Sequence, residues 1–264
     1  MLIKLDMKNA FDHVKLSFLY QVLRYFGFSA EFVCLIKACT DRPWISPLVN
    51  GRPADFFQAS RGLRQGCPLS PFLYILMAEV LSRKLSAEMV VGSLPGIKIA
   101  RGVDPINHAL FVDDSLLLGG ASLIIARDFK VILQNFGVIT GTLINKGKSV
   151  VYGWNVEHTT LLRIAHTLGF QGFEKWESIK WLGLPLTMGS RPSSLWNDVI
   201  FKIKAKIVSW GGYWLTQAAK LILIKAVLSA LPIFQCSLLL APKSVSAQIA
   251  KLLRDFLWEG GKGN

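Results

Sequence analysis

The sequence predicts an α+β fold in which a small antiparallel sheet with packed helices is followed by a mainly α-helical region. Short apolar runs bounded by turn residues, as expected for strands, occur at residues 2–5, 97–100, 108–118 and 150–152. Between them, apolar residues recur every three or four positions, which predicts helices that cover the sheet. After residue 153 helical patterns dominate, with a basic helix expected at 195–210 and an amphipathic one at 245–258.

Composition narrows the class of protein. The chain has 264 residues and is 52% hydrophobic, which is enough to bury a core and argues against a disordered protein. A formal net charge of +13 favours a polyanionic partner, with nucleic acid first and an anionic membrane surface second. The four cysteines form no CxxC motif or Cys/His cluster, so we expect a reduced intracellular protein without structural zinc.

Local signals place the elements of the first half. A short strand at residues 2–5 ends in Asp6, and apolar residues every four positions then predict a helix that stops at Gly27. A second helix is expected at Ala30–Cys39. The Asn50-Gly51 pair predicts a tight β-hairpin.

Capping residues place the longer helices. Ser70 as N-cap and Pro71 at the first helical position predict a helix that ends near Gly92. Ser122 is expected to cap a helix running to about Val138. Further helices are predicted at 157–168 and 218–231, and a short strand pair or turn at 180–186.

The segment from His108 to Leu118 places two adjacent carboxylates, Asp113 and Asp114, between apolar runs, which predicts a β-hairpin with the aspartates at its tip. Like charges so placed repel each other and are costly to desolvate, and a bound divalent cation removes that cost. Asp6 supplies a third carboxylate from another strand, as two-metal nucleotidyl transfer requires. Because successive strand side chains face opposite ways, we expect Asp113 to bind metal directly and Asp114 less directly.

Five motifs occur in a fixed order: LIKLDMKNAFD, RGLRQGCPLSPFLYIL, HALFVDDSLLL, GTLINKGKS and WLGLPL. Taken singly, each has a simpler explanation, such as a turn, a helix cap, a basic loop or a solvated lysine. In this order they resemble the palm motifs of reverse transcriptases, most of all the non-LTR (LINE-type) retrotransposon enzymes abundant in plants. The C-terminal part is similar to the segment that follows the polymerase core in those elements, so the resemblance covers nearly the whole chain.

The resemblance implies an RNA-directed DNA polymerase that adds dNTPs to a DNA primer on an RNA template with two Mg²⁺ (or Mn²⁺) ions. Asp6, Asp113 and Asp114 match the catalytic metal-binding triad, and the backbone carbonyl of Met7 would help to hold the second ion. Lys148 matches a lysine proposed to protonate the leaving pyrophosphate.

The resemblance also assigns substrate contacts. Phe11 matches the bulky gate that excludes a ribose 2′-hydroxyl, because an aromatic ring leaves no room for the extra oxygen. Arg64, Gln65 and Gly66 belong to the loop that packs against the incoming nucleotide and the template. Trp181 and Gly183 match the primer-grip turn. Val112 departs from the family pattern, in which alanine is usual.

By resemblance, residues 1–153 are a palm without fingers, 154–190 are the end of the palm with the primer grip, and 191–264 are a helical thumb-like region. Family members carry a fingers region before the first catalytic carboxylate, and its absence here predicts a fragment of a larger element. We expect an intracellular protein of the nucleus, the cytoplasm or both, with no stable membrane association.

Two other functions remain open. The chain could be a catalytically inactive nucleic-acid-binding remnant that uses the lysines at 202, 204 and 206. It could also be a membrane-associated protein built around residues 221–242, although Lys225 and Gln235 interrupt that apolar run and Pro232 would kink it.

Overall fold

The computed structural model describes residues 1–174, 179–186, 193–211 and 214–259. The chain divides into two compact units, Met1–Lys175 and Trp176–Asn264, and each is described by itself. The first unit combines a sheet with helices and the second is mainly helical, so the predicted α+β class is confirmed. The functional division at residues 153 and 190 stays a prediction.

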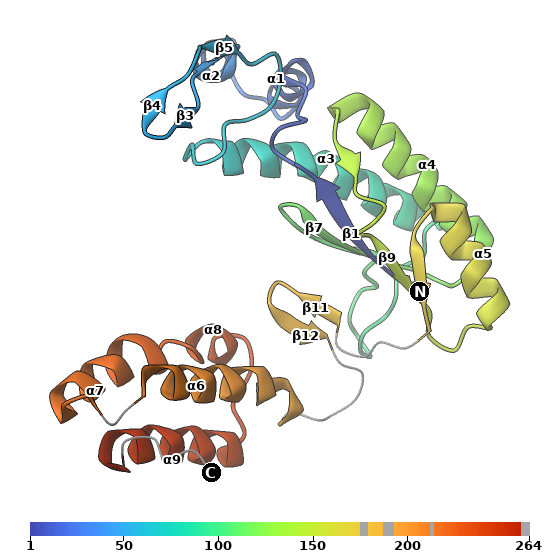
Figure 1. The fold of residues 1–264 in the computed structure, drawn as a ribbon. Helices are drawn as coiled ribbons and strands as arrows, with labels where there is room; N and C mark the ends of the chain where they lie inside the picture. The colour runs from blue at the N-terminus through green and yellow to red at the C-terminus, as the bar shows by residue number, and fades with distance from the viewer. Residues whose placement is uncertain (175–178, 187–192, 212–213, 260–264) are drawn as a thin grey trace. The chain divides into compact units, whose positions relative to one another are not determined.

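The sheet of the first unit is built around β1 (Leu2–Lys8) (Figure 1). The strand order is β10-β9-β1-β7-β6, and β8 pairs with the C-terminal end of β1. All pairs are antiparallel except β9 with β10. The other bounds are β6 (His108–Phe111), β7 (Asp114–Leu118), β8 (Leu143–Ile144), β9 (Val150–Tyr152) and β10 (Gln171–Phe173).

Strand β1 is longer than predicted. We expected it to end at Asp6, but it continues to Lys8, where β8 pairs with Met7 and Lys8. Asp6 therefore lies within a paired strand, where two neighbouring strands fix its backbone, and not at a loose strand end.

Three helices cover one face of this sheet (Figure 1). They are α3 (Ser70–Val91), α4 (Leu123–Thr140) and α5 (His158–Leu168). Ile3 and Leu5 are fully buried against them, whereas the alternate residues Lys4 and Asp6 are half-buried on the opposite face. Alternation along β1 thus separates an apolar face that packs from a charged face that stays accessible.

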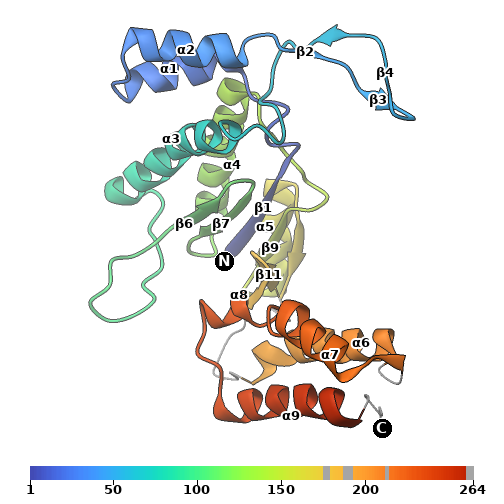
Figure 2. The ribbon, with the colours of Figure 1, turned by 90° about the vertical axis from the view of Figure 1, so that its left-hand side faces the viewer.

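A second apolar cluster joins α1 (Leu16–Tyr25) and α2 (Ala30–Thr40) to the N-terminal half of α3. The loop after α2 carries two short ladders, which lie beyond the helices in Figure 2. Asn50 and Gly51 have φ angles of 50° and 78°, the two positive values of a type I′ turn, so the predicted hairpin forms. The ladders pair β2 (Trp44–Ile45) with β5 (Phe57–Gln58) and β3 (Leu48–Val49) with β4 (Arg52–Pro53).

Two local predictions for this unit are wrong. Ser70 is the first residue of α3 and not its cap: Leu69 occupies the cap position, and the Ser70 hydroxyl donates to the Arg64 carbonyl over 2.7 Å. The apolar run at 97–100 forms no strand; Ile97 makes an isolated antiparallel bridge with Ile106. The predicted cap at Ser122 and the predicted end of the helix near Gly92 are confirmed.

The second unit opens with a hairpin of β11 (Ile179–Trp181) and β12 (Leu184–Leu186). A 3₁₀ turn (Ser194–Trp196) leads into α6 (Asn197–Trp210), and α9 (Lys243–Glu259) packs against α6. The prediction of one regular α-helix at 218–231 is wrong. The structure has α7 (Gln217–Leu223), followed directly by a π-helical segment (Ile224–Leu228), after which Ser229 N donates to Ile224 O. A separate short helix, α8 (Ile233–Cys236), follows Pro232.

The described part of the chain contains no helix long and apolar enough to span a membrane. The interruption of residues 221–242 by the π-helical segment and by Pro232 accounts for this in structural terms.

A polar network ties the Asp113 hairpin to α3. The buried Asn107 side chain donates to the carbonyls of Leu85 and Leu94, which leaves its Oδ1 as an acceptor. His108 Nδ1 lies 2.6 Å from that oxygen and therefore donates to it, so Nε2 accepts from Ser82 Oγ over 2.8 Å. Both ring nitrogens are satisfied in the neutral imidazole, and burial lowers the pKa of His108.

This network predicts a loss of stability on mild acidification. Because the folded pKa of His108 lies below the unfolded value of about 6.5, its contribution is present above pH 6.5 and declines as the pH falls below that value. The free energy of unfolding, measured by urea titration at pH 7.5 and 5.0, should depend less on pH in His108→Gln than in the wild type. His166→Gln, which alters an exposed histidine, is the control. Equal pH dependence in all three proteins would contradict the assignment.

Candidate active site

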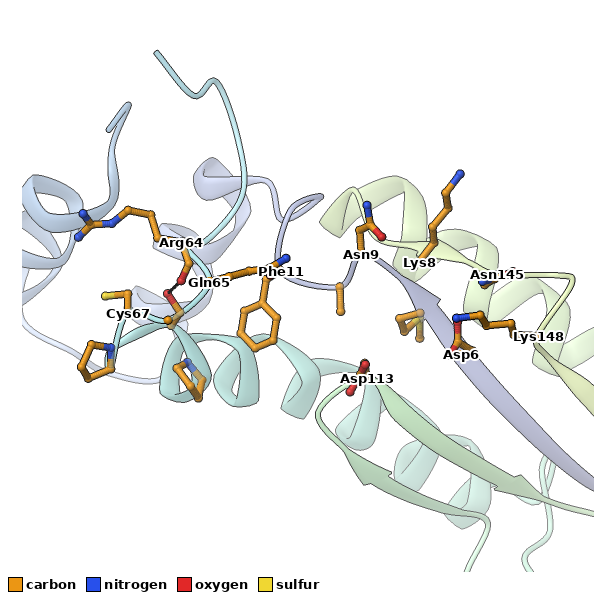
Figure 3. A pocket seen from close by; sticks show the side chains of 16 residues that line it. Asp6, Lys8, Asn9, Phe11, Arg64, Gln65, Cys67, Asp113, Asn145 and Lys148 are labelled. Atoms are coloured by element: carbon orange, nitrogen blue, oxygen red, sulfur yellow. Dashed lines mark hydrogen bonds between the residues drawn. The ribbon is translucent and has the colours of Figure 1, made fainter. Parts of the chain in front are cut away.

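One cavity of about 630 Å³ collects most of the predicted site residues (Figure 3). Its walls come from β1, the turn after it, the loop before α3, the Asp113 hairpin and the loop before β9. In the view of Figure 3, Asp113 lies between Phe11 on one side and Asp6 and Lys148 on the other. The predicted residues that line the cavity are Asp6, Met7, Phe11, Arg64, Gln65, Gly66, Asp113 and Lys148.

The three carboxylates lie on two neighbouring strands and one turn. Asp6 in β1 lies directly opposite Asp114 in β7. Asp113 follows Val112 in the two-residue turn that joins β6 to β7, since Phe111 pairs with Asp114. Asp113 lines the cavity and Asp114 is not among its lining residues, so the two adjacent aspartates occupy different environments.

The turn that carries Asp113 has a strained backbone. Val112 has a φ of 50°, a left-handed conformation that is a genuine outlier for a β-branched residue. Such a conformation costs roughly 1–3 kcal/mol and persists only when the surrounding structure holds it. Here the valine side chain packs against the second apolar cluster, and the β6–β7 ladder closes the turn.

Electrostatics link the three carboxylates. Burial raises the pKa of Asp114; Lys4 lowers it, while the charges of Asp113 and Asp6 raise it further. The carboxylates are thus close enough to repel one another. Their hard oxygen ligands suit Mg²⁺ or Mn²⁺, although no group of three or more His, Cys, Asp or Glu side chains among the described residues is already gathered as a metal site.

The loop that carries Lys148 is fastened to β1 at Asp6. Asn145 N donates to Asp6 O over 2.8 Å, and Asp6 N donates to the fully buried Ser149 Oγ over 3.1 Å. Lys148 N donates to Asn145 O within the turn. These bonds hold Lys148 at the cavity next to the strand that presents Asp6.

Phe11 is packed against α3. Its ring centre lies 5.0 Å from that of Tyr74, a side chain that is almost fully buried. Burial raises the pKa of Tyr74, and the charge of Asp113 adds to the effect, so Tyr74 is a neutral wall at neutral pH. The aromatic ring of Phe11 is thereby placed at the cavity with little freedom to withdraw.

Trp181 and Gly183 belong to the second unit, so the geometry of the cavity does not include them. Leu182 and Gly183 form the positive-φ turn between β11 and β12, at 51° and 79°. The indole nitrogen of Trp181 is buried, with no hydrogen-bond partner among the described residues. The predicted role of this turn in holding a primer stays a prediction.

The sequence reasoning missed several residues that line the cavity. Lys8 could have been found, because strand alternation places residues 4, 6 and 8 on one face. Asn9 follows with a positive φ of 47°, a conformation that asparagine tolerates. The others include Asn145 and Cys67, which come from loops whose positions depend on tertiary contacts, and Ser70 at the start of α3.

Comparisons with known proteins identify one family and several partial relatives. The sequence profile of the family described as reverse transcriptase (RNA-dependent DNA polymerase) matches residues 1–186. An uncharacterized mitochondrial protein of Arabidopsis thaliana is 48% identical over 68 residues, which cover 26% of this chain and 56% of that protein. The Pol polyprotein of the type-2 retrotransposable element R2DM of Drosophila melanogaster is 29% identical over 152 residues, covering 56% and 13%.

Among solved structures, telomerase from Candida albicans, in complex with a fragment of telomeric RNA, aligns with a TM-score of 0.49 at 13% identity and covers 100% of this chain and 46% of that one. The chain spans little more than half of the Arabidopsis protein and a smaller part of the Drosophila polyprotein. Since the family profile matches well over half of its length, this chain belongs to the reverse transcriptase (RNA-dependent DNA polymerase) family.

Proposed function

We propose that this chain is the polymerase region of a plant LINE-type non-LTR retroelement, in which it extends a DNA primer with dNTPs on an RNA template during retrotransposition. The observation that carries this proposal is the convergence of Asp6, Asp113, Lys148 and Phe11 on one cavity. Asp6 and Phe11 lie more than a hundred positions before Asp113 and Lys148 in the sequence, and each of the four has a chemical use in nucleotidyl transfer.

Asp6 and Asp113, with the Met7 carbonyl and a more indirect part for Asp114, would hold two Mg²⁺ or Mn²⁺ ions. When bound, the ions lower the pKa of the primer hydroxyl and neutralise charge on the leaving group. The carboxylates of the chain position the ions. Bound cations would relieve the electrostatic repulsion among the three aspartates, which favours cation binding at this site.

The remaining roles belong to side chains that face the substrate. Lys148 Nζ would donate a proton to the departing pyrophosphate. The Phe11 ring, supported by Tyr74, would exclude a ribose 2′-hydroxyl, while Arg64, Gln65 and Gly66 contact the nucleotide and the template. Trp181 and Gly183 would hold the primer end.

Asp113→Asn tests the carboxylate site. It should lower dNTP incorporation on a primed RNA template by roughly 100-fold or more, because a neutral amide no longer balances the charge of bound cations. Primer extension with Mg²⁺ or Mn²⁺ measures this. Asp104→Asn, an exposed aspartate away from the cavity, should leave the rate unchanged. Incorporation that survives Asp113→Asn would exclude this cavity as the active site.

Lys148→Gln tests the proposed proton donor. It should reduce kcat by roughly 100-fold while changing the KM for dNTP less, since general-acid catalysis acts on the chemical step. Lys146→Gln is a matched control, because Lys146 lies in the same loop but lines a separate hollow with Lys130 and His166. Equal effects of the two substitutions in steady-state assays would argue against a specific role for Lys148.

A catalytically inactive nucleic-acid-binding remnant is the second candidate. It is favoured by a single observation: on α6, Lys202, Lys204 and Lys206 are all exposed, whereas the neighbouring Ile203 and Ile207 are buried. Such a basic helix can bind phosphates without any chemistry.

Salt dependence tests this second candidate. Replacing the three lysines by glutamine should reduce the slope of log K against log[salt] by roughly 2 to 3, since each phosphate contact contributes about 0.7–0.9. Fluorescence anisotropy with labelled RNA or DNA measures the slope. Asp113→Asn should leave it unchanged. An unaltered slope in the lysine variant would place the binding surface elsewhere.

A further inference from the structure

The segment that carries Phe11 is held in place by a loop about fifty residues away in sequence. Gly62 N donates to Val14 O over 2.9 Å, and Leu63 N donates to Phe11 O over 2.8 Å. Leu63 is buried, so the second bond is sheltered from water. The backbone at residues 62–63 therefore runs alongside residues 11–14.

This approach is unusually close. A Cβ atom added to Gly62 would lie 2.7 Å from the Asp12 carbonyl oxygen, and Gly62 has a φ of +90° that favours glycine. A backbone contact this close allows no larger residue at position 62. It therefore fixes where the loop passes Asp12 before it continues to Arg64 and Gln65.

One side-chain bond completes the connection. Gln65 Nε2 donates to Asp12 Oδ1 over 2.9 Å. Gln65 lines the cavity and Asp12 does not, although Asp12 directly follows the gate residue Phe11. On its other side, the Phe11 ring meets Tyr74. Phe11 and Gln65, two walls of the cavity, are thus joined through the carboxylate of Asp12.

We propose that Asp12 is a positioning residue that fixes the separation between Phe11 and Gln65 and so determines how strongly the cavity prefers deoxynucleotides over ribonucleotides. This rests on the proposed function and deepens it. Without the Asp12 acceptor, Gln65 loses its hydrogen bond, the loop moves away from the turn, and the cavity gains room for a 2′-hydroxyl. Overall folding does not require this bond, because both side chains are exposed.

Asp12→Ala and Asp12→Asn form the matched pair, since asparagine keeps an oxygen acceptor and alanine does not. Hydrogen exchange on the full chain should show the Gly62 and Leu63 amides exchanging about tenfold faster in Asp12→Ala, with amides of the β1–β7 ladder as reference. The ratio of kcat/KM for dNTP to that for NTP should fall by about tenfold. Asp12→Asn should stay within about twofold of the wild type in both measurements.

Unchanged exchange in Asp12→Ala, or equal behaviour of the alanine and asparagine variants, overturns the positioning role. Faster exchange with unchanged discrimination overturns its link to specificity. A wild type that incorporates no nucleotide overturns the proposed function and the specificity link together, while exchange alone still decides the contact. If Asp12→Ala exchanges rapidly throughout β1, Gln65→Leu removes the same bond from its donor side and replaces it in the exchange experiment.

Discussion

The pairing of β1 on both sides is the constraint on which the first unit depends. One edge of the strand bonds to β7 and the other to β8 and β9, so its register cannot slip without moving every apolar side chain off the helical layer. That register places Asp6 opposite Asp114 and fixes the Lys148 loop through Asn145 and Ser149. The same set of backbone bonds that stabilises the core therefore also arranges the charged groups of the cavity.

The cavity combines two kinds of support. On the side of Asp6 and Lys148, ladder and turn bonds anchor the residues to the sheet. On the side of Phe11 and Gln65, a loop makes two backbone bonds and one exposed side-chain bond with the turn after β1. We expect the first side to open less often than the second, because it shares the cooperative stability of the sheet, whereas the second depends on a few loop contacts. This asymmetry suits a site whose charged groups stay fixed while a substrate enters beside the loop.

Much of the fold could be predicted where the cause is local. Asn50-Gly51 gave a type I′ turn because both residues tolerate positive φ, and Gly92 ends α3 for the same reason. Ser122 caps α4 because its side-chain oxygen accepts from Ile125 N. Prediction was wrong where a distant partner decides. Ser70 bonds to Arg64 instead of capping α3, β8 extends β1 past Asp6, and Ile97–Ala100 finds only one bridge. The candidate site shows the same contrast: its motif residues could be named from the sequence, and Lys8 could have been found by strand alternation. Asn145 at the cavity and the contact of Asp12 with Gln65 required the tertiary arrangement.

The positive φ of Val112 in the β6–β7 turn limits which residues can replace it. Most residues destabilise the fold when their backbone adopts the left-handed conformation, and only glycine, asparagine or aspartate adopt it at little cost. Yet those residues would give up the apolar contacts that the valine makes with the second cluster. Backbone and packing preferences therefore conflict at this position, so a substitution that relieves one penalty incurs the other.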